Sequence, residues 1–241
     1  MVLDLQATLN FITVLFAFLS AVFGLIVINA LFKNKLKMLF SDEKFFIFFF
    51  LIAGYAVFAL GELTWYLIYV VFEAAPTAGM PDFYWVTGAF FMLISFTALS
   101  SMLYRSYGQM HQLLPLVAFG SLLLILVSFY VYAAGSGGAE DSSVFLRYFY
   151  PLTTSLILIS SANLFLFYRY LGPIEVNLMP LFFANIGFLG GDLLYAYWGV
   201  SGFLGILAQT FYILAYGLSA FTFFTLLVKF YLHSSGKELL R

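Results

Sequence analysis

Seven apolar stretches, each long enough to cross a lipid bilayer, dominate this sequence of 241 residues. A transmembrane helix needs about 20 apolar residues, because each residue advances the helix by about 1.5 Å and the hydrocarbon core is about 30 Å thick. The predicted spans are Leu9–Phe32, Phe45–Phe72, Phe83–Tyr104, Leu113–Tyr132, Val144–Tyr168, Leu178–Trp198 and Phe203–Tyr231. The connections between them are short and leave nothing over for a soluble domain. The sequence therefore predicts one all-α integral membrane domain with seven transmembrane helices.

The composition supports a membrane protein and excludes several classes of function. Only 9% of the residues are charged, whereas soluble domains carry about 25%, so membrane lipids are the predicted surroundings. A net charge of -1 argues against nucleic acid as a partner, because no basic field exists to neutralise phosphates. The absence of cysteine excludes disulfides and thiolate metal sites. The two histidines, His111 and His233, lie at predicted cytosolic ends, and we predict neither a metal site nor a cofactor.

The basic residues predict the orientation of the chain in the membrane. Nine of them lie in the first, third and fifth connections or near the C-terminus: Lys33, Lys35, Lys37, Lys44, Arg105, Arg169, Lys229, Lys237 and Arg241. The opposite side holds only Arg147. Because basic loops stay in the cytosol, the N-terminus is predicted outside and the C-terminus inside, in a multi-pass protein of the cell membrane. The first span has basic residues after it and none before it, which is the reverse of a cleavable signal peptide, so we expect a retained helix.

An internal repeat is visible around the acidic residues of the second and sixth spans. The stretch Gly61–Tyr66 (GELTWY) resembles Gly191–Tyr197 (GDLLYAY), and Phe83-Tyr84 resembles Phe211-Tyr212. The second copy lies four spans after the first, so both copies point the same way. This spacing predicts a parallel 3+1+3 repeat, in which the fourth span links two three-helix units related by an axis along the membrane normal.

Glu62 and Asp192 are the only acidic residues well inside the predicted spans. A charged group in hydrocarbon costs at least about 2.5–3.5 kcal/mol, so such residues usually face the bundle interior or a wet cavity. Polar residues at helical spacing accompany them, which predicts a ligand pocket that opens outward. Its predicted lining is Glu62, Asp192, Tyr66, Trp65, Tyr195, Asn185, Gln209, Tyr212 and Tyr84. Alternatively, both acids are protonated and hold neighbouring helices together by hydrogen bonds.

Several short motifs resemble the membrane modules that precede histidine kinases and diguanylate cyclases in prokaryotes. They are Gly61-Glu62-Leu63-Thr64-Trp65, Pro81-Asp82-Phe83-Tyr84, Tyr150-Pro151 and Asp192-Leu193-Leu194-Tyr195. The resemblance covers about Gly54 to Ala220. It implies a receptor-like signalling module that binds a small molecule or lipid from the outer side and contacts a cytosolic signalling partner through its C-terminus. No kinase or cyclase follows Arg241, so we expect a standalone sensor, a fragment, or a relative with another role.

Two further resemblances leave alternative functions open. Seven helices in a 3+1+3 arrangement are similar to microbial rhodopsins and sugar-transporter-like proteins, but the seventh span has its only lysine, Lys229, at the cytosolic end, which excludes retinal attachment there. The paired acidic motifs resemble those of lysoplasmalogenase-like enzymes, which implies that Glu62 and Asp192 are the acid–base pair of a lipid hydrolase. A transporter or proton channel for small solutes is the third alternative. We favour the non-enzymatic sensor, because no catalytic motif occurs in the sequence.

Overall fold

The computed structural model describes residues 2–32, 39–74, 79–107, 113–135, 141–167, 177–198 and 202–238, and these residues form helices and no strand. The helices are α1 Val2–Leu31, α2 Glu43–Trp65, η2 Tyr66–Val71, α3 Met80–Tyr107, α4 Leu113–Gly135, α5 Asp141–Ser161, α6 Asn163–Leu166, α8 Met179–Trp198 and α9 Gly202–Glu238. Seven of these segments are long and apolar enough to cross a membrane. The predicted seven-helix, multi-pass architecture is therefore confirmed in the part of the chain that the structure describes.

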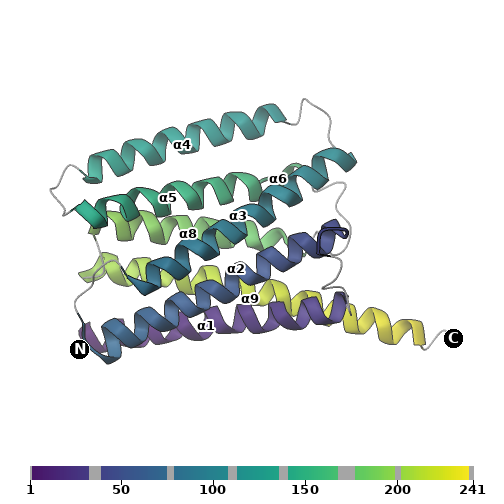
Figure 1. Cartoon of the computed structure of the whole chain (residues 1–241), viewed down its shortest axis with the longest axis horizontal. Coiled ribbons are helices and arrows are strands. Elements are labelled where there is room, and N and C mark those ends of the chain that lie inside the picture. The colour runs from purple at the N-terminus through teal and green to yellow at the C-terminus, as the bar shows by residue number, and fades with distance from the viewer. Residues whose placement is uncertain are drawn as a thin grey trace.

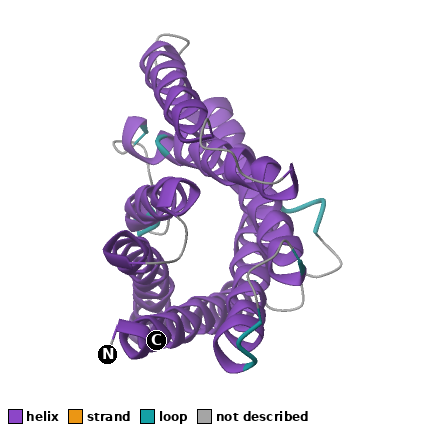
Figure 2. Ribbon diagram, turned by 90° about the vertical axis from the view of Figure 1, so that its left-hand side faces the viewer, coloured by secondary structure: helices purple, strands orange, loops and turns teal. Residues whose placement is uncertain are grey.

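Six of the seven membrane-length helices form a closed ring (Figure 2). Around the ring, α1 packs against α2, α2 against α3, α3 against α5, α5 against α8, α8 against α9, and α9 against α1. The remaining helix, α4, lies outside the ring against α5 and α8 (Figure 1). The two ends of the chain lie at opposite ends of the bundle, as an odd number of crossings requires.

The predicted span Val144–Tyr168 contains a break that the sequence pattern did not indicate, because the described chain leaves the α-helix at Ala162, between α5 and α6. Side chains at the break bond to nearby carbonyl oxygens. Ser161 donates to the carbonyl of Leu158 at 2.9 Å, and Asn163 Nδ2 donates to the carbonyl of Ser160 at 3.0 Å. Serine and asparagine compete in this way with the helical hydrogen bonds, which accounts for the interruption.

The predicted α-helix Phe45–Phe72 also differs from the structure, because its last turn is the π-helix η2. The amide of Phe72 bonds to the carbonyl of Leu67, five residues earlier, and Glu73 then ends the segment with φ of 52°. A π-helix has a longer period than an α-helix. In a continuous α-helix, Tyr69 and Glu73 would share a face with Glu62, but this α-helical spacing does not hold beyond Trp65.

A group of large, buried apolar side chains lies at the predicted cytosolic end of the bundle. Phe45 and Leu51 of α2, Phe96 and Leu103 of α3, and Phe223 of α9 are each at most 2% exposed. All five lie toward that end, because α2 begins there while α3 and α9 approach it with their C-terminal halves. Large apolar side chains thus fill this end of the ring, and the buried polar residues among them, Ser95 and Asn163, bond to the carbonyl of Ile47 and the hydroxyl of Ser100.

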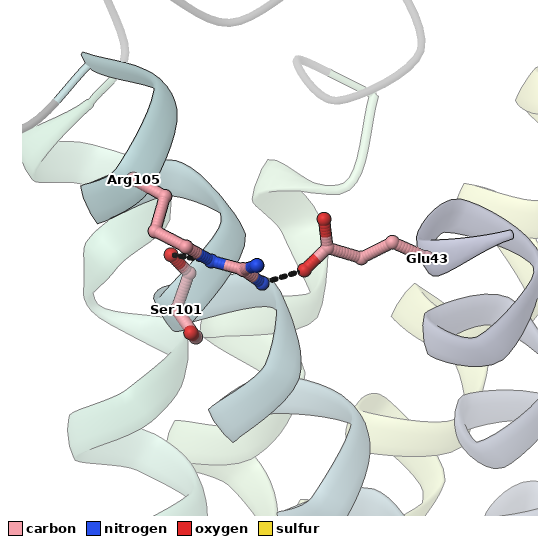
Figure 3. Close-up of polar contacts among 3 residues, drawn as sticks. All are labelled: Glu43, Ser101 and Arg105. Atoms are coloured by element: carbon pink, nitrogen blue, oxygen red, sulfur yellow. Dashed lines mark hydrogen bonds and ion pairs between the residues drawn. The ribbon is translucent and has the colours of Figure 1, made fainter. Parts of the chain in front are cut away.

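An ion pair joins α2 and α3 at the same end (Figure 3). Arg105 contacts the carboxylate of Glu43 and donates from Nε to the carbonyl of Ser101 at 3.4 Å. Both charged side chains are exposed. We expect a double-mutant cycle with Glu43→Gln and Arg105→Gln to give a coupling energy below about 1 kcal/mol, because exposed pairs are screened by water. Unfolding in mixed micelles measures it, and a coupling of several kcal/mol would contradict this expectation.

Candidate functional site

The two acidic residues inside the bundle are both bound by α9. Tyr212 donates a hydrogen bond to Oδ1 of Asp192 at 2.8 Å, and Tyr216 donates to Oε1 of Glu62 at 3.0 Å. The second oxygen of Asp192 accepts from the hydroxyl of Thr154 in α5 at 2.5 Å. Because Tyr212 and Tyr216 are one turn apart on α9, one face of this helix is tied to acids from α2 and α8.

Two further polar residues extend this face of α9 in both directions. Gln209 accepts from the hydroxyl of Thr13 in α1 at 3.1 Å, and the hydroxyls of Ser219 and Tyr55 in α2 are hydrogen-bonded at 2.7 Å. The four polar residues on this face of α9, which are Gln209, Tyr212, Tyr216 and Ser219, therefore each have a partner on another helix. Through these residues α9 is linked to α1, α2 and α8.

A glycine before each acid lets an aromatic side chain lie directly on the helix backbone. A Cβ atom on Gly61 would lie 2.7 Å from the indole nitrogen of Trp85, and one on Gly191 would lie 2.6 Å from the ring of Tyr212. Only glycine accommodates approaches this close. In both places the aromatic residue comes from the next membrane-spanning helix, α3 or α9. The indole N–H of Trp85 is buried beside Glu62, in a position that does not meet the geometry of a hydrogen bond.

Aromatic rings cover the acids on the predicted outer side. The ring of Trp65 lies 5.6 Å from Trp85 and 6.2 Å from Tyr195, measured between centroids, and Trp85 lies 6.2 Å from Tyr150. The hydroxyl of Tyr150 donates to Oδ1 of Asp82 at 2.7 Å. A third carboxyl thus joins the rim of this site, from the first turn of α3.

The structure places some predicted pocket residues together and others elsewhere. Glu62, Asp192, Trp65, Tyr195 and Tyr212 belong to the group described above. The other four predicted residues lie as follows: Tyr66 packs against Phe11 of α1 at 5.9 Å, Gln209 bonds to α1, Tyr84 is half-buried beside Phe83, and Asn185 is fully buried on the face of α8 that carries Asp192.

The sequence interpretation missed the role of Trp85, which it would assign by default to the membrane interface. A signal for it exists in the spacing along α3. Gly88 follows Trp85 by three residues, so both lie on one face of the helix, and Gly88 packs closely on Gly54 and Phe58 of α2. A face that carries a tightly packed glycine points at the neighbouring helix, and Trp85 points the same way.

The acids lie inside the bundle among many neighbouring groups, and only a small part of each residue is exposed. Glu62 and Asp192 are both half-buried, whereas Tyr55 and Tyr216 beside them are at most 1% exposed. In the described residues, no group of three His, Cys, Asp or Glu side chains is placed to hold a metal ion. The arrangement can therefore exchange protons or accept a ligand at its carboxyls, and it can also hold helices together.

Comparison with protein-family models, curated proteins and solved structures found no match for this chain. The resemblances to sensor modules, rhodopsin-like proteins and lysoplasmalogenases therefore stay predictions from short motifs. The function has to be inferred from the geometry of the site itself.

Proposed function

We propose that the protein is a heptahelical membrane sensor in which a ligand or proton at Glu62 and Asp192 controls the position of α9. The observation that carries this proposal is the pair of hydrogen bonds from Tyr212 and Tyr216 of α9 to the two acids. A proton or ligand that binds to either acid would weaken or strengthen the hydrogen bond between that acid and α9. The helix spans Gly202–Glu238, and its C-terminal part extends past the other helices (Figure 1). Movement of α9 would therefore reach the cytosolic side, where a signalling partner would bind.

The packing of the bundle supports a sensor more than a transporter. A transporter needs access to its site from both sides of the membrane, whereas a sensor needs access from one. At the predicted cytosolic end, buried phenylalanines and leucines fill the space between α2, α3 and α9. The polar side chains buried in that half, such as Ser95 and Asn163, are hydrogen-bonded to neighbouring helices. The lipid-hydrolase alternative lacks comparable support, because each carboxyl is bound to a different tyrosine and neither is hydrogen-bonded to the other.

We also propose that the ring is built from the predicted 3+1+3 repeat, with α1–α2–α3 matching α5–α8–α9 and α4 as the linker. Consecutive helices pack together within each set, and the sets meet at α3–α5 and α9–α1. The contacts of Gly61 with Trp85 and of Gly191 with Tyr212 then correspond to each other. This correspondence makes Trp85, one residue beyond the predicted Tyr84, the counterpart of Tyr212.

Releasing both tyrosines is the direct test of the proposed coupling. In the Tyr212→Phe, Tyr216→Phe double variant, we expect the cytosolic part of α9 to shift by about 2–5 Å, the scale of helix movements in switching proteins. The chain has no cysteine, so spin labels attach only to cysteines introduced for this purpose. Suitable exposed positions are Leu114 of α4 and Val228 of α9. Double electron–electron resonance in nanodiscs then measures the distance between the labels.

The matched control is Tyr132→Phe, which removes the same hydroxyl from an exposed position on α4. This variant should leave the distance between the labels unchanged. If the double variant also gives the wild-type distance, the two hydrogen bonds do not position α9 and the proposed sensor mechanism is wrong.

A further inference from the structure

We propose that the site binds an organic cation, namely an ammonium group carried by a small molecule or by a lipid headgroup. This inference rests on the proposed function in one respect, since the ammonium ligand would be the signal to which α9 responds. It concerns the chemical class of the ligand, which the position of α9 does not determine.

The charges around the site favour a cation. Tyr195 lies within electrostatic range of Asp82 and Glu62, and Tyr150 lies within range of Asp82 and Asp192, so three carboxyls lie near this pair of rings. The described hydrogen bonds to these carboxyls all come from uncharged donors, which are tyrosine and threonine hydroxyls and the amide of Gly79.

Basic side chains are scarce at the same end of the bundle. Arg147 lies within range of Tyr195 and is the one basic residue there in the described part of the chain. Three acids against one arginine leave an excess of negative charge when the acids are ionised. A cationic ligand would supply the missing positive charge.

The aromatic rings favour an organic cation over a metal ion. The ring of Trp65 contacts both Trp85 and Tyr195, with centroid distances of 5.6 Å and 6.2 Å. All three rings lie next to the acids. Aromatic faces attract ammonium groups through the ring quadrupole, and tryptophan attracts them more strongly than tyrosine or phenylalanine does. The carboxyls are not grouped as metal ligands in the described residues. An ammonium group is large enough to contact several of these rings and acids at once.

A buried polar side chain without a partner, Asn185, lies on the face of α8 that carries Asp192. Asn185 is 0% exposed, and neither its amide nitrogen nor its oxygen has a partner in the described structure. It precedes Asp192 by seven residues, so its side chain leaves α8 on the same face. Buried polar groups without partners are rare in folded proteins, and the side-chain oxygen of Asn185 can accept a hydrogen bond from an ammonium group.

The test uses the full chain in nanodiscs of phosphatidylglycerol, which has no ammonium group. Tetramethylammonium chloride is titrated while tryptophan fluorescence and the melting temperature are recorded, because Trp65 and Trp85 report directly on the site. Sodium chloride at equal ionic strength is the control for salt, and neopentyl alcohol, a neutral molecule of similar shape with one added hydroxyl, is the control for charge. We expect a saturable response to tetramethylammonium that neither control produces.

The acids should be required for this response. In the Glu62→Gln, Asp192→Asn double variant, we expect binding to weaken by about tenfold or more, the scale of losing one charge-assisted contact. Glu43→Gln, which neutralises an acid at the opposite end of the bundle, should bind like the wild type. If the double variant does not fold, Asp82→Asn at the rim of the site replaces it and should weaken binding in the same direction.

A second experiment distinguishes a lipid headgroup from a free small molecule as the source of the ammonium group. Nanodiscs that contain phosphatidylethanolamine should raise the melting temperature through the same acids if the ligand is a headgroup. A response in either arm that depends on Glu62, Asp192 or Asp82 supports the inference. No response beyond the salt and alcohol controls in both arms overturns it.

The two proposals fail in different ways. If tetramethylammonium binds but the distance from Leu114 to Val228 stays fixed, the coupling to α9 is wrong and the ligand class stands. If the tyrosine variants move α9 but no ammonium compound binds, the ligand class is wrong and the coupling stands.

Discussion

Replacing Asp192 with alanine is expected to lower the free energy of unfolding by about 1–3 kcal/mol, since two hydroxyls from two other helices lose their acceptor. Thr154 of α5 and Tyr212 of α9 both donate to this carboxyl. Hydrogen bonds between membrane helices average about 0.6 kcal/mol and reach about 1.7 kcal/mol. The loss of two such bonds therefore accounts for the lower part of the expected destabilisation. The unpaired hydroxyls that remain in the bundle add the rest. Reversible unfolding in mixed micelles measures the change.

The matched variant is Asp192→Asn, which keeps an oxygen acceptor in nearly the same volume. It should cost less than about 1 kcal/mol, because at least one of the two bonds survives. A wild-type stability of the alanine variant would contradict the contacts described for this carboxyl. A more stable alanine variant would mean that burying the acid costs more than its bonds contribute. The interpretation of Asp192 as a structural link would then be wrong, and a functional reason for keeping it would gain support.

Replacing Gly88 with alanine is expected to lower the free energy of unfolding by about 1–3 kcal/mol, the usual cost of overpacking. The added Cβ would lie 2.9 Å from the carbonyl oxygen of Gly54 and 2.6 Å from the ring of Phe58. The ring can turn aside, but the carbonyl belongs to the backbone of α2, so α2 and α3 must separate. The same unfolding measurement in mixed micelles applies.

Gly217→Ala on α9 provides the matched control for this substitution. A Cβ at Gly217 meets only the ring of Phe16, at 3.8 Å, which is ordinary contact distance. Because alanine favours a helix over glycine by about 0.5–1 kcal/mol, this variant should be as stable as the wild type or slightly more stable. Equal stabilities of the Gly88→Ala and Gly217→Ala variants would contradict the close approach of α2 and α3.

The polar residues of α9 show what helical spacing predicts and what it does not. Gln209, Tyr212, Tyr216 and Ser219 fall on one face by their spacing alone, and the structure gives each a partner on another helix. The identity of those partners was beyond prediction, since a helical period describes directions around one helix and not the neighbour on each side. Thr154 and Tyr150 on α5 were missed as partners of Asp192 and Asp82 for the same reason.

The sequence patterns also did not predict the local departures of the backbone from an α-helix. The π-helix at Tyr66–Val71 and the break at Ala162 lie in apolar stretches that satisfy the length for a membrane span. Hydrophobic length does not depend on whether the backbone bonds close after four or five residues, so neither feature changes the predicted span. Both change which side chains face the interior.

The sequence by itself determined the number and approximate extent of the membrane helices, because the hydrocarbon core requires about 20 apolar residues per crossing and tolerates few charges. It also marked Glu62 and Asp192 as the two unusual residues in that apolar setting. Only the tertiary structure decided the order of helices around the ring, the exclusion of α4 from it, and the meeting of both acids with α9. The physical reason is that lipid tails and neighbouring helices are equally apolar, so hydrophobicity alone does not distinguish a face that contacts lipid from one that contacts another helix.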